Sequence, residues 1–180
     1  MSFHFELTTV EKDYLQELAR LSILQCFDAN VILPKNVSER LKQPYGVFVT
    51  LKKQGQLRGC IGHIVGDRPI TEAITQMAQS AAFQDPRFPP LTREEVAEIE
   101  VGISILSPLR PCIPDEIVPG RHGLLVRSGL HSGLLLPQVA VEYGWNRETF
   151  LSQTCRKAGM GADCWRKADV EIFCFEAVIF

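Results

Sequence analysis

The stretch Gly46-Val47-Phe48-Val49-Thr50-Leu51-Lys52 is followed by the turn signal Gln54-Gly55 and then by Leu57-Arg58-Gly59-Cys60-Ile61-Gly62. The first run is rich in β-branched and aromatic residues, which favour strands, and a two-residue turn joins antiparallel strands. The sequence therefore predicts a β-hairpin over residues 46–61. The glycines of the second run predict a β-bulge or the close approach of another chain segment or a ligand.

Helices are predicted on both sides of this hairpin. Thr8 and Glu11 form a capping-box pattern, and leucines recur behind them at helical spacing over residues 9–27. A second helix begins at Pro69 and carries many small residues as far as Phe83. Further start signals for helices are Thr92 with Glu95, Pro137 and Asn146.

Further strands follow the helices along the chain. Residues 100–106 alternate between apolar and polar, and residues 123–127 and 130–136 predict a second hairpin. Residues 170–180 predict one long central strand. Because strands come in adjacent antiparallel pairs and not in βαβ units, the fold class is α+β, with a mainly antiparallel sheet flanked by helices. Residues 1–180 form one compact domain, and the proline-rich passage 107–119 marks a division into two subdomains.

The composition excludes several classes of function. The 180 residues are 46% hydrophobic and 22% charged, which is ordinary for a globular domain, and the net charge is −2. This balance gives no long-range attraction to nucleic acid or to an anionic membrane. The apolar runs are too short to span a membrane, and Met1 to Glu6 lack the features of a signal peptide. We therefore expect a cytoplasmic protein.

The six cysteines are scattered along the chain, and no two of them have a C-x-x-C spacing. A zinc ribbon, a thioredoxin-type motif and a disulfide framework are therefore not expected. Cys26, Cys112 and Cys174 are interpreted as reduced, buried cysteines that act as small hydrophobes. Cys60 and His63 have the spacing of half a zinc site, but nothing in the spacing supplies the other ligands, so we predict no metal.

Five motifs occur in a fixed order along the chain. They are LRGCIG at 57–62, DPRFPP at 85–90, GRHGL at 120–124, LLPQVA at 135–140 and CRKAG at 155–159. Together they resemble the AMMECR family, whose prokaryotic members are called AmmeMemoRadiSam system protein A. The resemblance covers residues 44–180. His63 departs from it, since relatives often have a small or hydroxyl residue there.

The resemblance implies an α+β fold with two subdomains. It also implies partners, because prokaryotic relatives are encoded near a Memo-like protein and a radical-SAM protein. It implies no agreed reaction, cofactor or substrate. We therefore look for the chemistry in the residues of the motifs themselves.

Cys60 is the candidate nucleophile. Its glycine neighbours and Arg58 form a setting that can favour the thiolate, although a buried thiol in a tight hairpin is an equally good interpretation. A nucleophilic cysteine needs a base, and His122, between two glycines, is the candidate. A histidine bonded within its own turn is the alternative for His122.

The candidate substrate-binding residues surround these two. Arg87 fits either an anion clamp or an ion pair with a surface carboxylate, and Asp85 fits either a part of that clamp or a turn residue that accepts backbone N–H bonds. Gln138 fits either a ligand amide or a turn cap. The full set of candidate binding residues is Arg58, Gly59, Gly62, Asp85, Arg87 and Gln138.

Two functions remain open from the sequence. In the first, the protein is a small enzyme that uses Cys60 and His122 on a small anionic molecule, within a pathway that also contains radical-SAM and Memo-like proteins. In the second, it is a non-catalytic binding or adaptor module, whose glycines and prolines shape a surface for a protein partner. Nucleic-acid binding is a third and weaker hypothesis, because the protein is acidic.

Overall fold

The computed structural model describes residues 5–35 and 38–180, so the first four residues, on which the expected lack of a signal peptide partly rests, lie outside the described part. The chain divides into two units. Unit 1 comprises residues 1–106 together with 178–180, and unit 2 comprises residues 107–177. The division falls at the start of the proline-rich passage. Within the described residues, no helix is both long and apolar enough to cross a bilayer.

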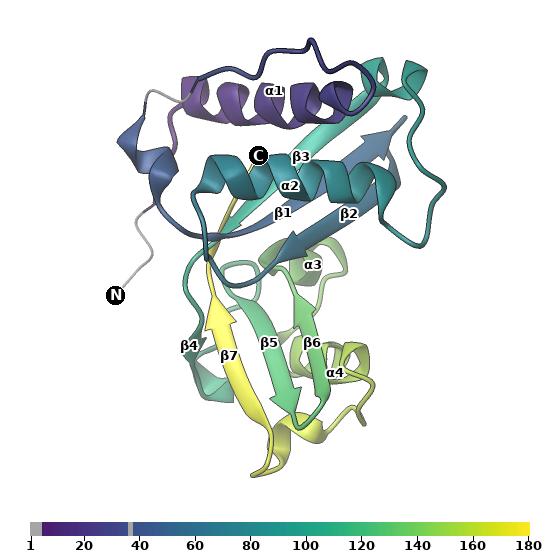
Figure 1. The fold of residues 1–180 in the computed structure, drawn as a ribbon. Helices are drawn as coiled ribbons and strands as arrows, with labels where there is room; N and C mark the ends of the chain where they lie inside the picture. Colours follow the sequence, from purple (N-terminus) through teal and green to yellow (C-terminus); the bar gives the residue numbers. More distant parts are fainter. Residues whose placement is uncertain (1–4, 36–37) are drawn as a thin grey trace. The chain divides into compact units, whose positions relative to one another are not determined.

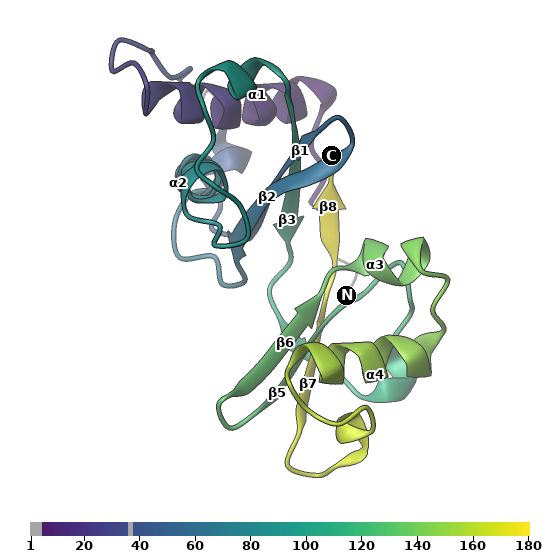
Figure 2. The ribbon, with the colours of Figure 1, turned by 90° about the vertical axis from the view of Figure 1, so that its right-hand side faces the viewer.

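Unit 1 is a four-stranded sheet with two helices on one face (Figures 1 and 2). The strand order is β2-β1-β3-β8, so β2 and β8 are the edges. The elements are α1 (Thr9–Gln25), β1 (Gly46–Lys53), β2 (Gln56–His63), α2 (Ile70–Phe83), β3 (Ile99–Leu106) and β8 (Ala177–Ile179), with the 3₁₀ turns η1 (Glu39–Lys42) and η2 (Glu94–Ala97).

The helix signals of the sequence are reproduced in unit 1. The predicted capping box at the start of α1 is confirmed, because Thr8 Oγ1 accepts from the Glu11 N–H and the Glu11 carboxylate accepts from the Thr8 N–H. The second pattern yields only the 3₁₀ turn η2, in which Glu95 still accepts from the Thr92 N–H at 3.0 Å. α1 and α2 pack on each other, and α2 also packs on β1 and β2.

Alternation along β1 gives the sheet one covered and one open face. Val47, Val49 and Leu51 are fully buried and belong to the same core as α1 and α2. Phe48 and Thr50 point to the other side and are only partly buried. That second side, defined by Phe48, Thr50 and their cross-strand neighbours, is called the open face below.

A bulge sets the register of the first hairpin. Gln54 and Gly55 have positive φ values of 52° and 75°, which suits a tight two-residue turn. The register shifts opposite Leu51 and Lys52, and Arg58 is the residue left without a partner. Beyond this bulge, Thr50 is paired with Cys60 and Val49 with Ile61. The predicted bulge therefore decides on which face the side chain of Cys60 lies.

Unit 2 is a second four-stranded sheet with its own helices. The strand order is β4-β7-β5-β6, and the register pairs are antiparallel. Its core is formed around Leu124, Phe150 and Cys174. The elements are β4 (Arg110–Pro111), β5 (Gly123–Ser128), β6 (His131–Leu135), α3 (Pro137–Glu142), α4 (Arg147–Lys157) and β7 (Glu171–Phe175), with η3 (Pro114–Glu116) and η4 (Cys164–Arg166).

The predicted α+β class and its antiparallel pairing are confirmed by these two sheets. The prediction of one long central strand over residues 170–180 is wrong. The strand stops at Glu176, so β7 is an inner strand of unit 2, whereas β8 is an edge strand of unit 1. The segments before and after Glu176 are both apolar because each one forms a strand of a sheet. The sequence pattern therefore does not show the break between β7 and β8.

Candidate functional site

The thiol of Cys60 lies on the open face of unit 1, on the edge strand β2. The cross-strand neighbour is Thr50, whose Oγ1 is 3.3 Å from Cys60 Sγ. Thr50 is itself paired with Gly102 on its other side, so no side chain stands there. The thiol is partly exposed. A partly exposed cysteine next to a hydroxyl can react with molecules from solvent, which a core cysteine cannot do.

The backbone of Cys60 is held by the loop that follows α2. Cys60 N–H donates to Asp85 Oδ2 at 2.8 Å, and Arg87 Nη2 donates to the Cys60 carbonyl oxygen at 3.3 Å. An edge strand has unpaired N–H and C=O groups, and here one acidic and one basic side chain take the place of a neighbouring strand. The same contacts place the Arg87 guanidinium beside Cys60.

Asp85 and Arg87 form a tight ion pair. Asp85 is buried, with a side chain 2% exposed, and accepts from Arg87 Nε at 2.9 Å and from Nη2 at 2.7 Å. The Arg87 guanidinium, and after it the N–H groups of Cys60 and Arg87, hold the pKa of Asp85 far below its ordinary range against the effect of burial. Asp85 is therefore ionised and has an internal role.

Arg58 makes its contacts away from the thiol. Its Nε and Nη2 donate to the Glu95 carboxylate at 3.1 and 3.0 Å, and Nη1 donates to the carbonyl oxygen of Pro89 at 2.9 Å. The hydrogen bonds from Arg58 lower the pKa of Glu95 to about 2. The predicted anion-binding role of Arg58 thus competes with a set of internal contacts that already occupies its donors.

The two glycines beside Cys60 make room for protein atoms. A Cβ on Gly59 would overlap the carbonyl oxygen of Ala81 in α2, and a Cβ on Gly62 would overlap the ring of Phe48. Gly59 therefore lets α2 approach the sheet, and Gly62 lets the Phe48 ring lie across β2. Both observations match the predicted close approach of another chain segment, while the predicted ligand contact stays a prediction.

His122 belongs to unit 2, whereas Cys60 belongs to unit 1. The imidazole is buried, and its Nδ1 accepts from the Val118 N–H at 3.1 Å. Burial, followed by the charges of Arg110 and Arg121, lowers the pKa of His122. His122 is thus a neutral imidazole bonded within its own turn, as the alternative interpretation has it, and its pairing with Cys60 stays a prediction.

Gln138 and His63 share an unusual property. Each has a buried side-chain atom, Gln138 Oε1 and His63 Nε2, that makes no hydrogen bond to any described residue. Gln138 lies in the first turn of α3, and His63 ends β2 with Nε2 3.8 Å from Asp67 Oδ1. The position of Gln138 is compatible with a ligand amide but does not decide between that role and a turn cap.

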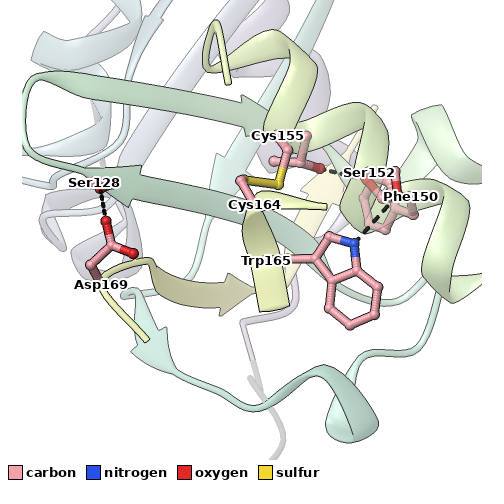
Figure 3. The surroundings of a disulfide bond; sticks show 8 residues. Ser128, Phe150, Ser152, Cys155, Cys164, Trp165 and Asp169 are labelled. Carbon is pink, nitrogen blue, oxygen red and sulfur yellow. Dashed lines mark hydrogen bonds between the residues drawn. A yellow bond between two sulfur atoms is a disulfide. The ribbon is translucent and has the colours of Figure 1, made fainter. Parts of the chain in front are cut away.

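The cysteines differ from expectation at two places. Cys155 and Cys164 form a disulfide, although the sequence led us to expect no disulfide framework (Figure 3). The end of α4 and the turn η4 bring the two residues together across nine positions of sequence, a contact that depends on folding and not on spacing. Cys26 is exposed, because α1 ends one residue before it, whereas Cys174 is buried as predicted.

Within the described residues, no group of three or more His, Cys, Asp or Glu side chains has a geometry that could hold a metal ion. Two cavities of about 540 and 450 Å³ can be described, and both lie elsewhere in unit 1. The first is lined by Phe5 and Arg40, and the second lies between α1 and α2, lined by Tyr14 and Gln76. Cys60 is not among the residues that line either of these two cavities.

Comparison with known proteins assigns the chain to a family. Residues 16–180 match the sequence model of AMMECR1. The chain belongs to the AMMECR1 family. Protein MK0488 of Methanopyrus kandleri is 45% identical over 97% of this chain and 90% of its own. A protein of Thermococcus gammatolerans is 42% identical over 93% of this chain and 88% of its own.

The fold of the AMMECR1 family is also seen by experiment. The crystal structure of the uncharacterized protein PH0010 from Pyrococcus horikoshii is similar to this chain with a TM-score of 0.85. The two proteins are 41% identical, and the match covers 92% of this chain and 88% of the other. The predicted family is therefore confirmed, together with its α+β fold.

Sequence reasoning missed two residues of this AMMECR1 site. Thr50 was read only as part of a strand, although it is the side chain that touches the Cys60 thiol. Glu95 was read as a helix start, although it is the partner of Arg58. The register of the hairpin was the signal that could have indicated Thr50, but it depends on the position of the bulge.

Proposed function

We propose that this AMMECR1-family protein binds a small anionic molecule beside Cys60 and uses the Cys60 thiol as a nucleophile toward it. The observation that supports this proposal is the position of Arg87. Its guanidinium bonds the carbonyl oxygen of Cys60 itself, yet the Arg87 side chain remains 54% exposed. A cation fixed next to a reachable thiol is an arrangement suited to an anionic substrate with an electrophilic carbon.

Arg87 is held in place without using all of its donors. Asp85 accepts from Nε and Nη2, and the Phe88 ring lies 5.5 Å from the guanidinium carbon. The remaining nitrogen, Nη1, has no partner among the described residues and is free for a carboxylate or phosphate oxygen. A guanidinium held on one side by a buried carboxylate loses little freedom when it binds an anion on the other side.

The proposed step is simple nucleophilic attack. The Cys60 thiol loses its proton to solvent, and Sγ forms a bond to an electrophilic carbon of the bound molecule while the bond from that carbon to its leaving group breaks, so that the leaving group departs into solvent with the electron pair. Thr50 Oγ1 donates a hydrogen bond to the sulfur once the proton has left. Arg87 holds the anionic group, so that the electrophilic carbon faces the sulfur.

Charge-selective alkylation tests this proposal directly. The native protein is treated with iodoacetate, which is anionic, and with iodoacetamide, which is neutral and of similar size. We expect the ratio of the iodoacetate rate to the iodoacetamide rate to be several-fold higher at Cys60 than at the exposed Cys26. Arg87→Gln should abolish this preference, whereas Arg40→Gln, which removes an arginine that bonds Glu11 of α1, should not. Equal ratios at Cys60 and Cys26 would overturn the proposal.

A binding module is the second candidate function, and one observation favours it. Arg58, Gly59, Gly62 and Asp85 all make internal contacts, so most of the motif is explained by the shape of the surface without any chemistry. The resemblance names a Memo-like protein as the partner to test first, with a radical-SAM protein in the same cytoplasmic pathway. A complex that survives Cys60→Ala but is lost on Phe88→Ala would support this function over the first.

A further inference from the structure

Gly102 leaves a gap on the open face of unit 1 that no protein atom fills. Its neighbours Val101 and Ile103 are buried in the core on the helix side, so a side chain at position 102 would point to the open face. A Cβ placed there would meet nothing closer than the Thr50 carbonyl oxygen, at 3.8 Å. Thr50 is paired with Gly102 on one side and with Cys60 on the other, so the gap and the thiol flank the same threonine.

Packing inside the protein does not account for this glycine. At Gly46, Gly59 and Gly62, the other glycines of this sheet, protein atoms occupy the place where a Cβ would stand. Gly102 has room for a methyl group, and it is not among the glycines with a positive φ. Glycine weakens a strand, and inside a strand it often marks a place where a ligand comes close to the backbone. The gap over Gly102 fits this second role.

Ser104 supplies a polar group next to the gap. It lies two residues further along β3, directly opposite Phe48, so its side chain is on the same open face as the gap. Ser104 is only 5% exposed, and its hydroxyl group makes no hydrogen bond to any described residue. Buried hydroxyl groups in proteins are nearly always hydrogen-bonded. The Ser104 hydroxyl is therefore a donor that lacks an acceptor.

We propose that the molecule bound beside Cys60 extends across Thr50 into the gap over Gly102 and ends in a neutral oxygen atom that accepts a hydrogen bond from Ser104. This inference rests on the proposed function, because Cys60 and Arg87 hold the other end of the molecule. It narrows the substrate class to elongated monoanions. These are carboxylates or phosphates that carry a carbonyl or hydroxyl oxygen at the end remote from the charge.

The sheet sets the length of such a molecule. β1 lies between β2 and β3, and neighbouring strands are about 4.8 Å apart, so Cys60 and Gly102 are separated by roughly 10 Å across the sheet. A two-carbon anion such as iodoacetate reaches the thiol but not Ser104. The remote end is neutral, because the side chains opposite Gly102 and Ser104 on β1 carry no charge that could pair with a second anion.

Protection of Cys60 from iodoacetamide tests this inference. The probes are oxo acids, from levulinate to its eight-carbon homologue, with the ketone next to the terminal methyl group. Each is compared with the unsubstituted acid of the same chain length, and none of them alkylates a thiol. The alkylation rate at Cys60 is divided by the rate at Cys26 and followed as the acid concentration is raised. We expect a long oxo acid to protect Cys60 at about three- to tenfold lower concentration than its unsubstituted partner, the effect of one hydrogen bond.

Two variants and a control locate the effect. Ser104→Ala should make the oxo acid and the unsubstituted acid of equal length protect alike. Gly102→Ala fills the gap with a methyl group for which the fold has room, so it should weaken protection by both long acids but not by acetate. Ser80→Ala is the matched control, because Ser80 lies on α2, across the sheet from the open face, where its hydroxyl bonds Gln84. It should leave protection by every acid unchanged.

Two outcomes would overturn this inference and leave the proposed function standing. One is a set of long oxo acids that protect the wild type no better than the unsubstituted acids, and the other is an advantage of the oxo acid that survives Ser104→Ala. In both cases the wild type would still show the preference of Cys60 for iodoacetate. Loss of that preference in the wild type, with no acid protecting Cys60, would overturn the proposed function and this inference together.

Discussion

Cys60 Sγ lies 3.3 Å from Thr50 Oγ1, the side chain directly opposite on β1. The two residues meet on the open face of unit 1, where neither one is fully buried. A hydroxyl at this distance can donate to a sulfur anion or accept from a thiol. The pair therefore connects the reactivity of Cys60 to a single neighbouring side chain that can be replaced without changing its volume.

Thr50→Val should slow the alkylation of Cys60 by iodoacetamide about three- to tenfold. The valine keeps the shape of threonine but cannot donate to the sulfur, and one such hydrogen bond contributes roughly 0.5–1.5 kcal/mol. The rate at Cys26 in the same molecules, read by peptide mass spectrometry, controls for reagent and pH. An unchanged ratio between the two cysteines would show that the Thr50 hydroxyl does not support the thiolate.

The sequence was sufficient to predict the hairpin but not to predict the contact between Cys60 and Thr50. The turn Gln54-Gly55 and the β-branched run before it predict two antiparallel strands, and both are present. An unbroken ladder from that turn would place Val49 opposite Cys60 and turn the thiol toward the helices. The unpaired Arg58 shifts the register by one, so Cys60 faces outward opposite Thr50. The glycines of the second strand indicate a bulge, but they do not determine which residue is left unpaired.

Other features were hidden because they depend on contacts between distant segments. Nothing in the spacing of Cys155 and Cys164 indicates a disulfide, since their approach follows from the turn after α4. The break between β7 and β8 at Glu176 cannot be predicted from the sequence either, because both flanking segments have the composition of strands. Local signals with a fixed geometry were reliable by comparison: Asn146 caps α4 through the Thr149 N–H at 2.9 Å, as predicted.

Gly59→Ala should destabilise unit 1 by about 1–3 kcal/mol, the usual cost of an overpacked core. The added methyl group would overlap the backbone carbonyl of Ala81, which cannot move without shifting α2. Urea unfolding of the full chain, followed by circular dichroism, measures the change. Gly102→Ala is the matched control in the same sheet, because the nearest atom to its Cβ would be 3.8 Å away. Equal loss in both variants would contradict the role of Gly59 in helix packing.

Arg58→Lys should lower the stability of unit 1 by about 1–3 kcal/mol and leave the alkylation of Cys60 unchanged. Lysine keeps the charge but cannot donate at once to the Glu95 carboxylate and to the Pro89 and Pro90 carbonyl oxygens. Unfolding in urea gives the first quantity and thiol labelling gives the second. A variant that is stable yet slower at Cys60 would instead return Arg58 to the anion-binding role expected from the sequence.

Asp85→Asn should destabilise the protein by about 2–3 kcal/mol at pH 7, and this difference should shrink at acid pH. The folded pKa of Asp85 is depressed, chiefly by Arg87, so its ionised form contributes stability that is fully present above the unfolded pKa of ~3.9. As the pH falls below about 4, the unfolded chain binds a proton at Asp85 that the folded chain does not bind. The stability of the wild type therefore decreases toward that of the variant.

Urea midpoints at pH 7, 5 and 3.5 measure the trend. Asp67→Asn is the control, because Asp67 pairs with Arg68 on the surface, where solvent screening leaves little change. A difference between wild type and Asp85→Asn that stayed constant down to pH 3.5 would show that Asp85 acts by shape and not by charge, and the fixed position of Arg87 beside Cys60 would then need another explanation.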